Sequence, residues 1–247
     1  MGNAMITEIM LAGTRVHHLE SDQIMPVIQE LSSKAGSQRI VFLSTYDLVR
    51  AWFSRRKRAQ LESAALVLPV QKGIQRAAVI AGRTIPARHM PFQLIIQVLG
   101  AIEAQQGSLY IVGGRPYALE KAEANLKYTF PKVRVVGRFP GYFRKGVENS
   151  LLTAARKSSP DVLLVGTGVS GGDKWLVKHT DSLPSGIAVS APQVFRVFTE
   201  QRRRPSRFLF NSGLKDSLKV LLPWHWLRIP FYCILVCRLL IDRIRRR

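Results

Sequence analysis

Two stretches of the chain decide its fold: Leu109–Phe143, LYIVGGRPYALEKAEANLKYTFPKVRVVGRFPGYF, and Asp161–Trp175, DVLLVGTGVSGGDKW. Each contains a run of four apolar residues that ends at glycines, Gly113-Gly114 in the first and Gly166 with Gly168 in the second. A buried strand that ends in glycines is where α/β proteins bind ligands, because the chain turns tightly there and exposes backbone N–H groups. Two such strand ends predict one ligand-binding cleft at the edge of a parallel sheet.

Apolar runs alternate with segments of helical periodicity along most of the chain. We predict strands at Ile6–Leu11, Arg39–Ser44, Ala65–Pro69, Leu109–Val112, Val133–Val136, Val162–Val165 and Ile187–Val189. We predict helices at Ser21–Ser33, Asp47–Ser63, Met90–Gln105, Tyr117–Tyr128 and Gly146–Ser158. Strands that alternate with helices of about a dozen residues are typical of a doubly wound parallel sheet. The pattern therefore predicts an α/β fold with a mostly parallel, Rossmann-like sheet and helices on both faces.

The chain is strongly basic, with a formal net charge of +21 over 247 residues. Such a charge attracts polyanions: nucleic acid, an anionic membrane surface or phosphorylated ligands. About half of the excess lies from Arg202 onward, where 12 lysines and arginines stand against two acids, and Arg55–Arg58 is a second basic run. The sequence carries no helix-turn-helix, RNP or zinc signature, so nucleic acid is not the expected partner.

The C-terminal segment differs in character from the rest of the chain. After the basic hinge Arg202–Pro205, the apolar stretch Val220–Ile241 is interrupted by prolines and by Arg228 and Arg238. Charges at bilayer depth are costly, whereas tryptophan and tyrosine favour the headgroup zone. We predict an α/β domain at residues 1–200 and a basic, amphipathic, helical appendage at 201–247 that lies on an anionic membrane surface. A helix packed on the core is the alternative, and a membrane span is the least favoured interpretation.

Cys233 and Cys237 are the two cysteines, four residues apart, and would share one face of a helix. They do not indicate a disulfide framework. The N-terminus lacks a basic region followed by an apolar one, so no secretory signal is visible. These features predict a reducing compartment and a cytosolic face. The five histidines lack metal-ligand spacing, and we predict neither a metal nor a cofactor.

The glycine motifs and their surroundings resemble the WecG/TagA/CpsF family of bacterial glycosyltransferases. The matching blocks are Val112–Pro116, Phe130-Pro131, Val135–Gly137, Gly141–Phe143, Pro160-Asp161 and Val165–Gly168. The resemblance extends from about Arg39 to Tyr232. It implies transfer of an N-acetylmannosamine-type sugar from a UDP donor to a polyprenyl-diphosphate-linked acceptor. The implied setting is cell-envelope polysaccharide synthesis by a peripheral protein at the cytoplasmic face of the bacterial inner membrane.

Several positions depart from the family pattern within the motifs that are expected to contribute to catalysis. Val70 stands where an apolar-Pro-Asp-Gly motif places the family's catalytic acid, and valine cannot accept a proton. The Thr-x-Asn motif reads Ser44-Thr45-Tyr46, which keeps the hydroxyl and loses the amide. The Pro-Lys-Gln-Glu-like turn keeps its acid alone, as Asp173. Two interpretations follow: a diverged transferase that uses another base, or a non-catalytic relative that binds a nucleotide sugar or lipid-linked saccharide at the membrane.

The candidate site residues follow from these motifs. Ser44 and Asp173 are expected near the chemistry, because proton transfer needs such groups within hydrogen-bond reach. Asp173 is otherwise a helix N-terminal acid, and Asp47 is a weaker base candidate, more typical of a helix cap. The expected substrate-binding residues are Gly113, Gly114, Arg115, Tyr142, Gly166, Gly168, Arg88, Arg203, Arg204 and Arg228. The alternatives are tight turns for the glycines and surface charges for Arg88 and Arg115; self-association is left open.

Overall fold

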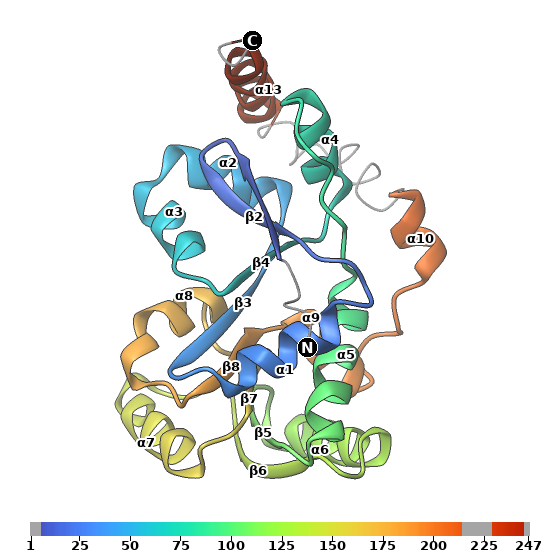
Figure 1. The fold of residues 1–247 in the computed structure, drawn as a ribbon. Helices are drawn as coiled ribbons and strands as arrows, with labels where there is room; N and C mark the ends of the chain where they lie inside the picture. The colour runs from blue at the N-terminus through green and yellow to red at the C-terminus, as the bar shows by residue number, and fades with distance from the viewer. Residues whose placement is uncertain (1–5, 214–228, 245–247) are drawn as a thin grey trace. The chain divides into compact units, whose positions relative to one another are not determined.

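The computed structural model describes residues 6–213 and 229–244. Its main feature is a six-stranded sheet with the strand order β4-β3-β8-β7-β5-β6 (Figure 1). The strands are β3 (Ser37–Leu43), β4 (Leu66–Pro69), β5 (Ser108–Val112), β6 (Arg134–Phe139), β7 (Val162–Val165) and β8 (Gly186–Ser190). The pairs β3–β8, β8–β7, β7–β5 and β5–β6 are parallel. The predicted α/β fold with a Rossmann-like sheet is therefore confirmed.

Helices connect the strands and follow the last of them. They are α1 (Ile24–Ser33), α2 (Thr45–Phe53), α3 (Arg55–Glu62), α4 (Lys72–Ile80), α5 (Pro91–Ala104), α6 (Pro116–Thr129), α7 (Glu148–Ser158), α8 (Gly172–Lys178), α9 (Pro192–Phe198), α10 (Arg207–Ser212) and α13 (Ile229–Ile244). The predicted helices near α1, α5, α6 and α7 are present. Helices α4 and α9 were not predicted; each is short, with nine and seven residues.

The chain forms two compact units. The first unit comprises Met1–Glu20, Phe42–Met90 and Pro205–Arg247, and the second comprises Ser21–Val41 and Pro91–Arg204. Strand β3 contributes to both units. The predicted division into residues 1–200 and 201–247 stays a prediction.

Helices cover both faces of the sheet in the second unit. Tyr110 and Val112 of β5 and Leu163 of β7 pack in one cluster with side chains of α7 and α8. The intervening residues, such as Leu109, point to the opposite face and are fully buried. Helix α1 contacts β8 and α5, and α9 contacts α5 and α6. Figure 1 shows α7 and α8 on the other side of these strands from α1 and α5, as the sequence predicts.

A hairpin precedes the sheet in the first unit. Strands β1 (Thr7–Leu11) and β2 (Thr14–His18) pair antiparallel, joined by Ala12 at φ 48° and Gly13 at φ 72°. Two consecutive residues with positive φ are typical of a type I′ turn, which matches the twist of a hairpin. The predicted first strand is thus present, but it belongs to this hairpin and not to the six-stranded sheet. Strand β2 was not predicted.

The prediction of a single helix at Asp47–Ser63 is wrong, because this segment forms two helices, α2 and α3, that meet at Ser54. The backbone of Ser54 is extended, at φ −128° and ψ 107°, which ends α2. Its hydroxyl accepts a hydrogen bond from the Lys57 N–H and so caps the start of α3. A serine at this position offers the backbone a local alternative to a continuous helix.

Besides α10, the described part of the predicted appendage at 201–247 contains helix α13. It contacts α4 and α2 of its own unit, with Leu235 and Leu239 buried. Its other faces expose Ile234 and Leu240 together with the free cysteines, which do share a side of the helix. Within residues 6–213 and 229–244, no helix has the length and apolar character that crossing a membrane requires. Arg228 and most of the tryptophan-bearing segment before α13 lie outside the described residues.

Candidate functional site

The strand order reverses direction between β5 and β7. From β5 the chain crosses outward to β6, whereas from β7 it crosses to β8 on the opposite side. Open α/β sheets bind ligands at the carboxyl edge beside such a reversal, because the two loops separate there. Gly113-Gly114 follows β5, and Gly166 and Gly168 follow β7. The predicted glycine motifs therefore occupy the topological position at which a ligand is expected.

Five glycines let three backbones approach closely at this edge; we call Gly113, Gly114, Gly141, Gly166 and Gly168 the glycine loop cluster. A Cβ atom on Gly113 would lie 2.8 Å from the Gly166 Cα, and one on Gly141 would collide with the Thr167 carbonyl oxygen. The Gly114 N–H donates to the Thr167 carbonyl at 2.7 Å, and the Gly141 N–H donates to the Gly114 carbonyl at 2.8 Å. Larger residues would drive the loops apart.

Several of these amides are occupied within the cluster. The Gly113 N–H donates to the Phe139 carbonyl at 2.9 Å, and the Gly166 N–H donates to the Val112 carbonyl at 2.6 Å. In the described part of the chain, by contrast, no backbone carbonyl accepts from the N–H groups of Thr167 or Gly168. Of the two glycine turns after β7 and β5, the turn after β7 thus contributes the N–H groups of Thr167 and Gly168 as donors to an anion.

Two side chains border the cluster and are exposed. Tyr142 is 67% exposed, and its ring lies over Gly168, where a Cβ atom would be 2.8 Å from two ring carbons. The Arg115 side chain is exposed at the N-terminus of α6, directly after Gly114. Phe143 instead packs edge-on against Phe139 and Trp175. Of the two neighbouring aromatic residues, Tyr142 is thus the one available to a ligand.

Asp173 lies in the first turn of α8, close to a buried arginine of β3. The Arg39 residue is 2% exposed; burial lowers its pKa, and the negative charge of Asp173 opposes that shift. A buried guanidinium without a negative partner would be strongly destabilising. Asp173 therefore acts as a counter-ion for Arg39. Sequence reasoning missed Arg39, although a lone arginine at the start of a buried strand is a signal that could have identified it.

A carboxylate on α7 holds the helix that carries Asp173. Glu148 accepts hydrogen bonds from Trp175 Nε1 at 2.6 Å and Lys178 Nζ at 3.2 Å, and His179 Nε2 lies 2.9 Å away. Burial raises the pKa of Glu148, but these three partners outweigh it and leave the pKa below its ordinary value. Sequence reasoning did not identify Glu148, because its partners belong to a separate helix.

Ser44 and Asp47 form a hydrogen-bonded pair in the first unit, at the carboxyl end of β3. The Ser44 hydroxyl donates to Asp47 Oδ2 at 2.6 Å and accepts from the Asp47 N–H at 3.1 Å. Lys57 Nζ lies 3.0 Å from Asp47 Oδ1. The Val70 N–H donates to the Leu43 carbonyl at 3.1 Å, so Val70 runs beside the residue that precedes Ser44. Ser44, which was expected near the chemistry, thus forms its side-chain hydrogen bonds with Asp47 of its own unit.

Arg88 binds the end of α10 within the first unit. Its guanidinium donates to the Phe210 carbonyl at 2.6 Å and lies 4.0 Å from the Phe210 ring centre. Lys72 Nζ donates to the Ser212 carbonyl at 2.8 Å. The last carbonyls of a helix lack internal partners and carry partial negative charge, so two cations satisfy them well. We call Lys72 and Arg88 the α10 clasp.

The remaining candidate arginines are dispersed. The Arg204 guanidinium lies 5.9 Å from the Phe92 ring centre in the second unit, and Arg203 is exposed. Arg228 lies outside the described residues. In the described ranges, no group of three His, Cys, Asp or Glu side chains is placed to hold a metal ion.

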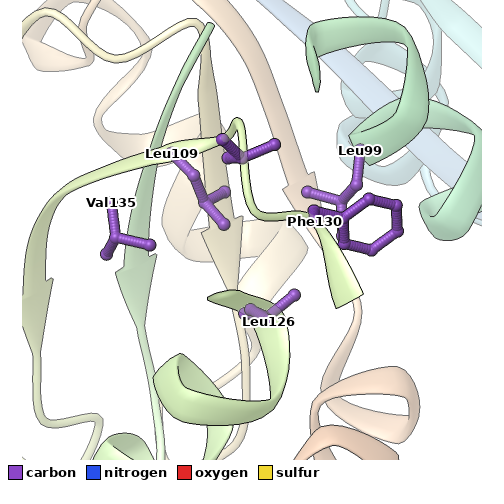
Figure 2. A pocket seen from close by; sticks show the side chains of 6 residues that line it. Leu99, Leu109, Leu126, Phe130 and Val135 are labelled. Atoms are coloured by element: carbon purple, nitrogen blue, oxygen red, sulfur yellow. The ribbon is translucent and has the colours of Figure 1, made fainter. Parts of the chain in front are cut away.

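Two hollows in the second unit lie away from the carboxyl edge. Figure 2 shows an apolar pocket between α5, α6 and the strands that has no room for a water molecule; it is lined by Leu99, Leu109, Leu126, Phe130, Val133 and Val135. A surface hollow of about 390 Å³ is lined by Gly100, Glu103, Ala104, Gln106, Pro131 and Lys132. Its residues precede β5 and β6, which places it at the amino edge. Neither hollow coincides with the predicted site.

A parallel α/β sheet with glycine-rich loops at its reversal point is an arrangement in which many enzymes bind nucleotides. The model of the glycosyl transferase WecG/TagA/CpsF family matches residues 9–247, nearly the whole chain. The chain therefore belongs to this glycosyltransferase family, which confirms the predicted membership and enzyme class. Membership implies a nucleotide-sugar donor and an acceptor as substrates. A comparison with curated proteins found no match.

Proposed function

We propose that the chain transfers an N-acetylmannosamine-type sugar from a UDP donor to a polyprenyl-diphosphate-linked acceptor in cell-envelope polysaccharide synthesis. The observation that supports this proposal is the glycine loop cluster at the point where the strand order reverses. The family to which the chain belongs transfers sugars. A dense arrangement of backbone at a strand end favours a diphosphate, because N–H groups there can approach anionic oxygens closely.

Each group around the cluster has a proposed role. The N–H groups of Thr167 and Gly168 donate to the diphosphate, and the exposed Arg115 guanidinium neutralises its charge. The exposed ring of Tyr142 stacks on the uracil or the sugar. Gly113, Gly114 and Gly166 contribute through close packing, since their amides are bonded within the protein.

We place the protein at the cytoplasmic face of the membrane, attached by its first unit. Helix α13 exposes Ile234, Leu240 and Ile244 beside the cation Arg243. A helix with exposed apolar residues and basic neighbours binds anionic lipid surfaces, at about 1 kcal/mol for each lysine or arginine near the surface. The basic start of α3 adds exposed positive charge to the same unit.

A non-catalytic binding protein on this fold is the second candidate. The observations that favour it are the apolar Val70 at the family's acid position and the pairing of Asp173 with Arg39. This candidate predicts nucleotide-sugar binding without turnover.

Calorimetric titration with UDP and UDP-N-acetylmannosamine, followed by donor-hydrolysis and transfer assays, tests the proposal. Tyr142→Ala should weaken UDP binding about 5- to 100-fold, the range for loss of one base-stacking contact. Tyr128→Ala is the matched control, since Tyr128 is 91% exposed on α6, and it should bind as the wild type does. Binding with turnover supports the transferase, and binding without turnover even with a lipid-linked acceptor supports the second candidate. Absence of UDP binding would refute both.

A further inference from the structure

We infer that the corner between α2 and α3 is a second membrane-contacting surface, which binds anionic phospholipid headgroups; this rests on the proposed membrane attachment of the first unit. The α2–α3 corner consists of Tyr46, Arg50, Phe53, Arg55 and Arg56, and all five side chains are exposed. Aromatic rings favour the headgroup zone of a bilayer, and arginines favour its anionic surface. The corner combines both kinds of side chain.

Helical periodicity aligns the three corner residues of α2. Tyr46, Arg50 and Phe53 are spaced by four and three residues, so they share one side of the helix. The buried residues Leu48 and Ala51 lie on the opposite side. The Arg50 guanidinium lies 5.7 Å from the Tyr46 ring centre, and the Phe53 side chain is 53% exposed. The outer side of α2 therefore presents rings and a cation together.

The break at Ser54 adds two more cations beside the Phe53 ring. Phe53 is the last residue of α2, and Arg55 is the first residue of α3. Because the extended backbone of Ser54 turns the chain between the two helices, the exposed ring and the exposed residues Arg55 and Arg56 meet at one corner. A continuous helix would have distributed these residues around its axis.

The basic run Arg55–Arg58 divides into a structural half and an outward half. Lys57 Nζ lies 3.0 Å from Asp47 Oδ1, and the Arg58 guanidinium donates to a backbone carbonyl near the end of α2 at 3.4 Å. Among the residues that the structure describes, Arg55 and Arg56 have side chains in no hydrogen bond or ion pair. Asp47 is the one acid from residue 45 to residue 58, and Lys57 neutralises it. The positive charge at the corner is therefore directed at an external anionic partner.

An anionic bilayer fits the corner better than nucleic acid does. Duplex phosphates bind guanidinium groups without an aromatic ring beside them, whereas a bilayer surface offers the ring an apolar layer just below the phosphates. The corner is also continuous with the surface already proposed to meet the membrane, because α13 contacts α2 within the first unit (Figure 1). Attachment at both α13 and the corner would fix the orientation of this unit on the bilayer.

The experiment measures partition coefficients with vesicles of phosphatidylglycerol and phosphatidylcholine by sedimentation. The double variant Arg55→Ser with Arg56→Ser should bind about 25-fold more weakly than the wild type, at about 5-fold for each arginine near the surface. Phe53→Ser should bind about 4- to 10-fold more weakly, because about half of the side chain is available for transfer out of water. Phe53→Leu should retain binding, which separates the apolar contact from the fold of the corner.

Matched controls lie in the second unit. Tyr128→Ser removes an aromatic side chain that is also exposed, and the double variant Lys132→Ser with Lys157→Ser removes the same net charge from exposed positions. Both controls should bind the vesicles as the wild type does. Equal losses in the controls and in the corner variants would overturn the inference, because net charge alone would then account for binding.

Three further results would overturn the inference or separate it from the proposed function. Corner variants that bind anionic vesicles as tightly as the wild type would leave attachment to α13 alone and refute the corner. Corner variants that bind vesicles normally but lose binding to duplex DNA would assign the corner to nucleic acid. A wild type that binds no anionic vesicle would refute both membrane surfaces. UDP affinity and sugar transfer are measured separately, so their absence would refute the proposed transferase and not the corner.

Discussion

The indole Nε1 of Trp175 donates a 2.6 Å hydrogen bond to Glu148 Oε1, which ties α8 to α7. Lys178 and His179 meet the same carboxylate, so one acid contacts three side chains of the segment that follows Gly171. The helix that presents Asp173 to Arg39 therefore depends on Glu148 for its position. Helix α8 has seven residues, too few to be stable by itself. The hydrogen bonds to the Glu148 carboxylate therefore fix its orientation.

Glu148→Gln should destabilise the protein by about 1–3 kcal/mol at pH 7, the magnitude for bonds to a charged group. The folded-state pKa of Glu148 is lowered, so its stabilising contribution is complete above about pH 4.3, the unfolded value, and is lost as pH falls through the folded value. Urea unfolding at pH 7 and pH 4 measures both effects. In Glu148→Gln this part of the pH dependence should be absent; an unchanged dependence would contradict the assignment.

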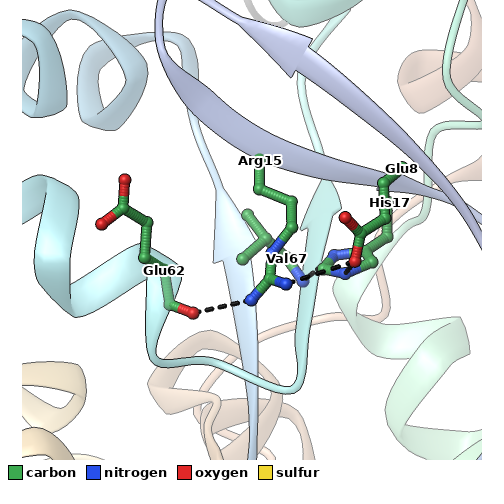
Figure 3. Close-up of polar contacts among 5 residues, drawn as sticks. All are labelled: Glu8, Arg15, His17, Glu62 and Val67. Carbon is green, nitrogen blue, oxygen red and sulfur yellow. Dashed lines mark hydrogen bonds and ion pairs between the residues drawn. The ribbon is translucent and has the colours of Figure 1, made fainter.

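His17 should make the first unit less stable in mild acid. Its Nδ1 accepts the Val67 N–H at 2.9 Å, and Glu8 lies 3.6 Å from its Nε2 (Figure 3). Burial lowers the pKa of His17 despite the nearby Glu8 carboxylate, so the unfolded chain binds the proton more readily. The contribution of neutral His17 to stability is therefore complete above about pH 6.5, and it declines as pH falls from there toward the folded-state pKa of His17.

Thermal unfolding of the wild type and His17→Asn between pH 7.5 and about pH 5 checks this sign. Asparagine keeps a side-chain oxygen near the position of Nδ1 but does not titrate. The variant should therefore lose less stability on acidification than the wild type. An equal loss of stability in the two proteins would show that another group causes the acid sensitivity, such as His89, whose pKa is also lowered by burial.

Gly168→Ala should disrupt the glycine loop cluster. Gly168 has φ 89°, and an added Cβ would lie 2.8 Å from the Tyr142 ring. Strain at positive φ and displacement of the ring together should lower stability by about 1–3 kcal/mol and weaken UDP binding. Gly146→Ala is the control, because nothing lies within 4 Å of its added Cβ. Equal UDP affinities in the two variants would argue against a ligand at this edge.

Arg88→Ala should loosen α10. The variant loses a 2.6 Å bond to the Phe210 carbonyl and the stacking on the Phe210 ring, for about 1–3 kcal/mol. Limited proteolysis should then cut near residues 205–213 more readily. Arg76→Ala, an exposed arginine of α4, removes the same charge and should leave the cleavage rate unchanged. If both variants are cleaved as slowly as the wild type, the α10 clasp does not hold this segment.

The exposed apolar side of α13 should carry membrane attachment. Ile234→Glu with Leu240→Glu places two negative charges on it and should reduce sedimentation with anionic phospholipid vesicles at least about 10-fold. Val136→Glu changes an exposed apolar residue of β6 in the second unit and should not affect sedimentation. Vesicles of zwitterionic lipid should bind the wild type weakly. Equal vesicle binding by all three proteins would contradict attachment through α13.

The sequence predicted those parts of the fold that depend on local pattern. The strand at Val162–Val165 appears at its predicted bounds, because a short apolar run between Pro160 and Gly166 has one reasonable interpretation. The hairpin turn at Ala12-Gly13 was not anticipated, because alanine rarely adopts positive φ and the Asn-Gly signal is absent. The break at Ser54 was missed because a polar residue within a charged run does not interrupt helical periodicity.

The candidate site was predictable in position but not in contacts. Glycines after two strands located the reversal point, yet their sequence could not reveal that Gly113 and Gly166 donate their amides to neighbouring carbonyls. Asp173 was correctly expected in the first turn of a helix, whereas its partner Arg39 comes from a distant strand. Pairings between remote residues depend on the tertiary fold, which periodicity does not encode.

The two cysteines of α13 give the appendage a built-in pair of attachment points. Cys233 and Cys237 are both exposed and free, about one helical turn apart. A reagent with two thiol-reactive arms can bridge such a pair and hold a spectroscopic label rigidly to the helix. The protein thus needs no added cysteine for orientation measurements at a lipid surface, and any treatment that oxidises or caps thiols will alter the very surface proposed to meet the membrane.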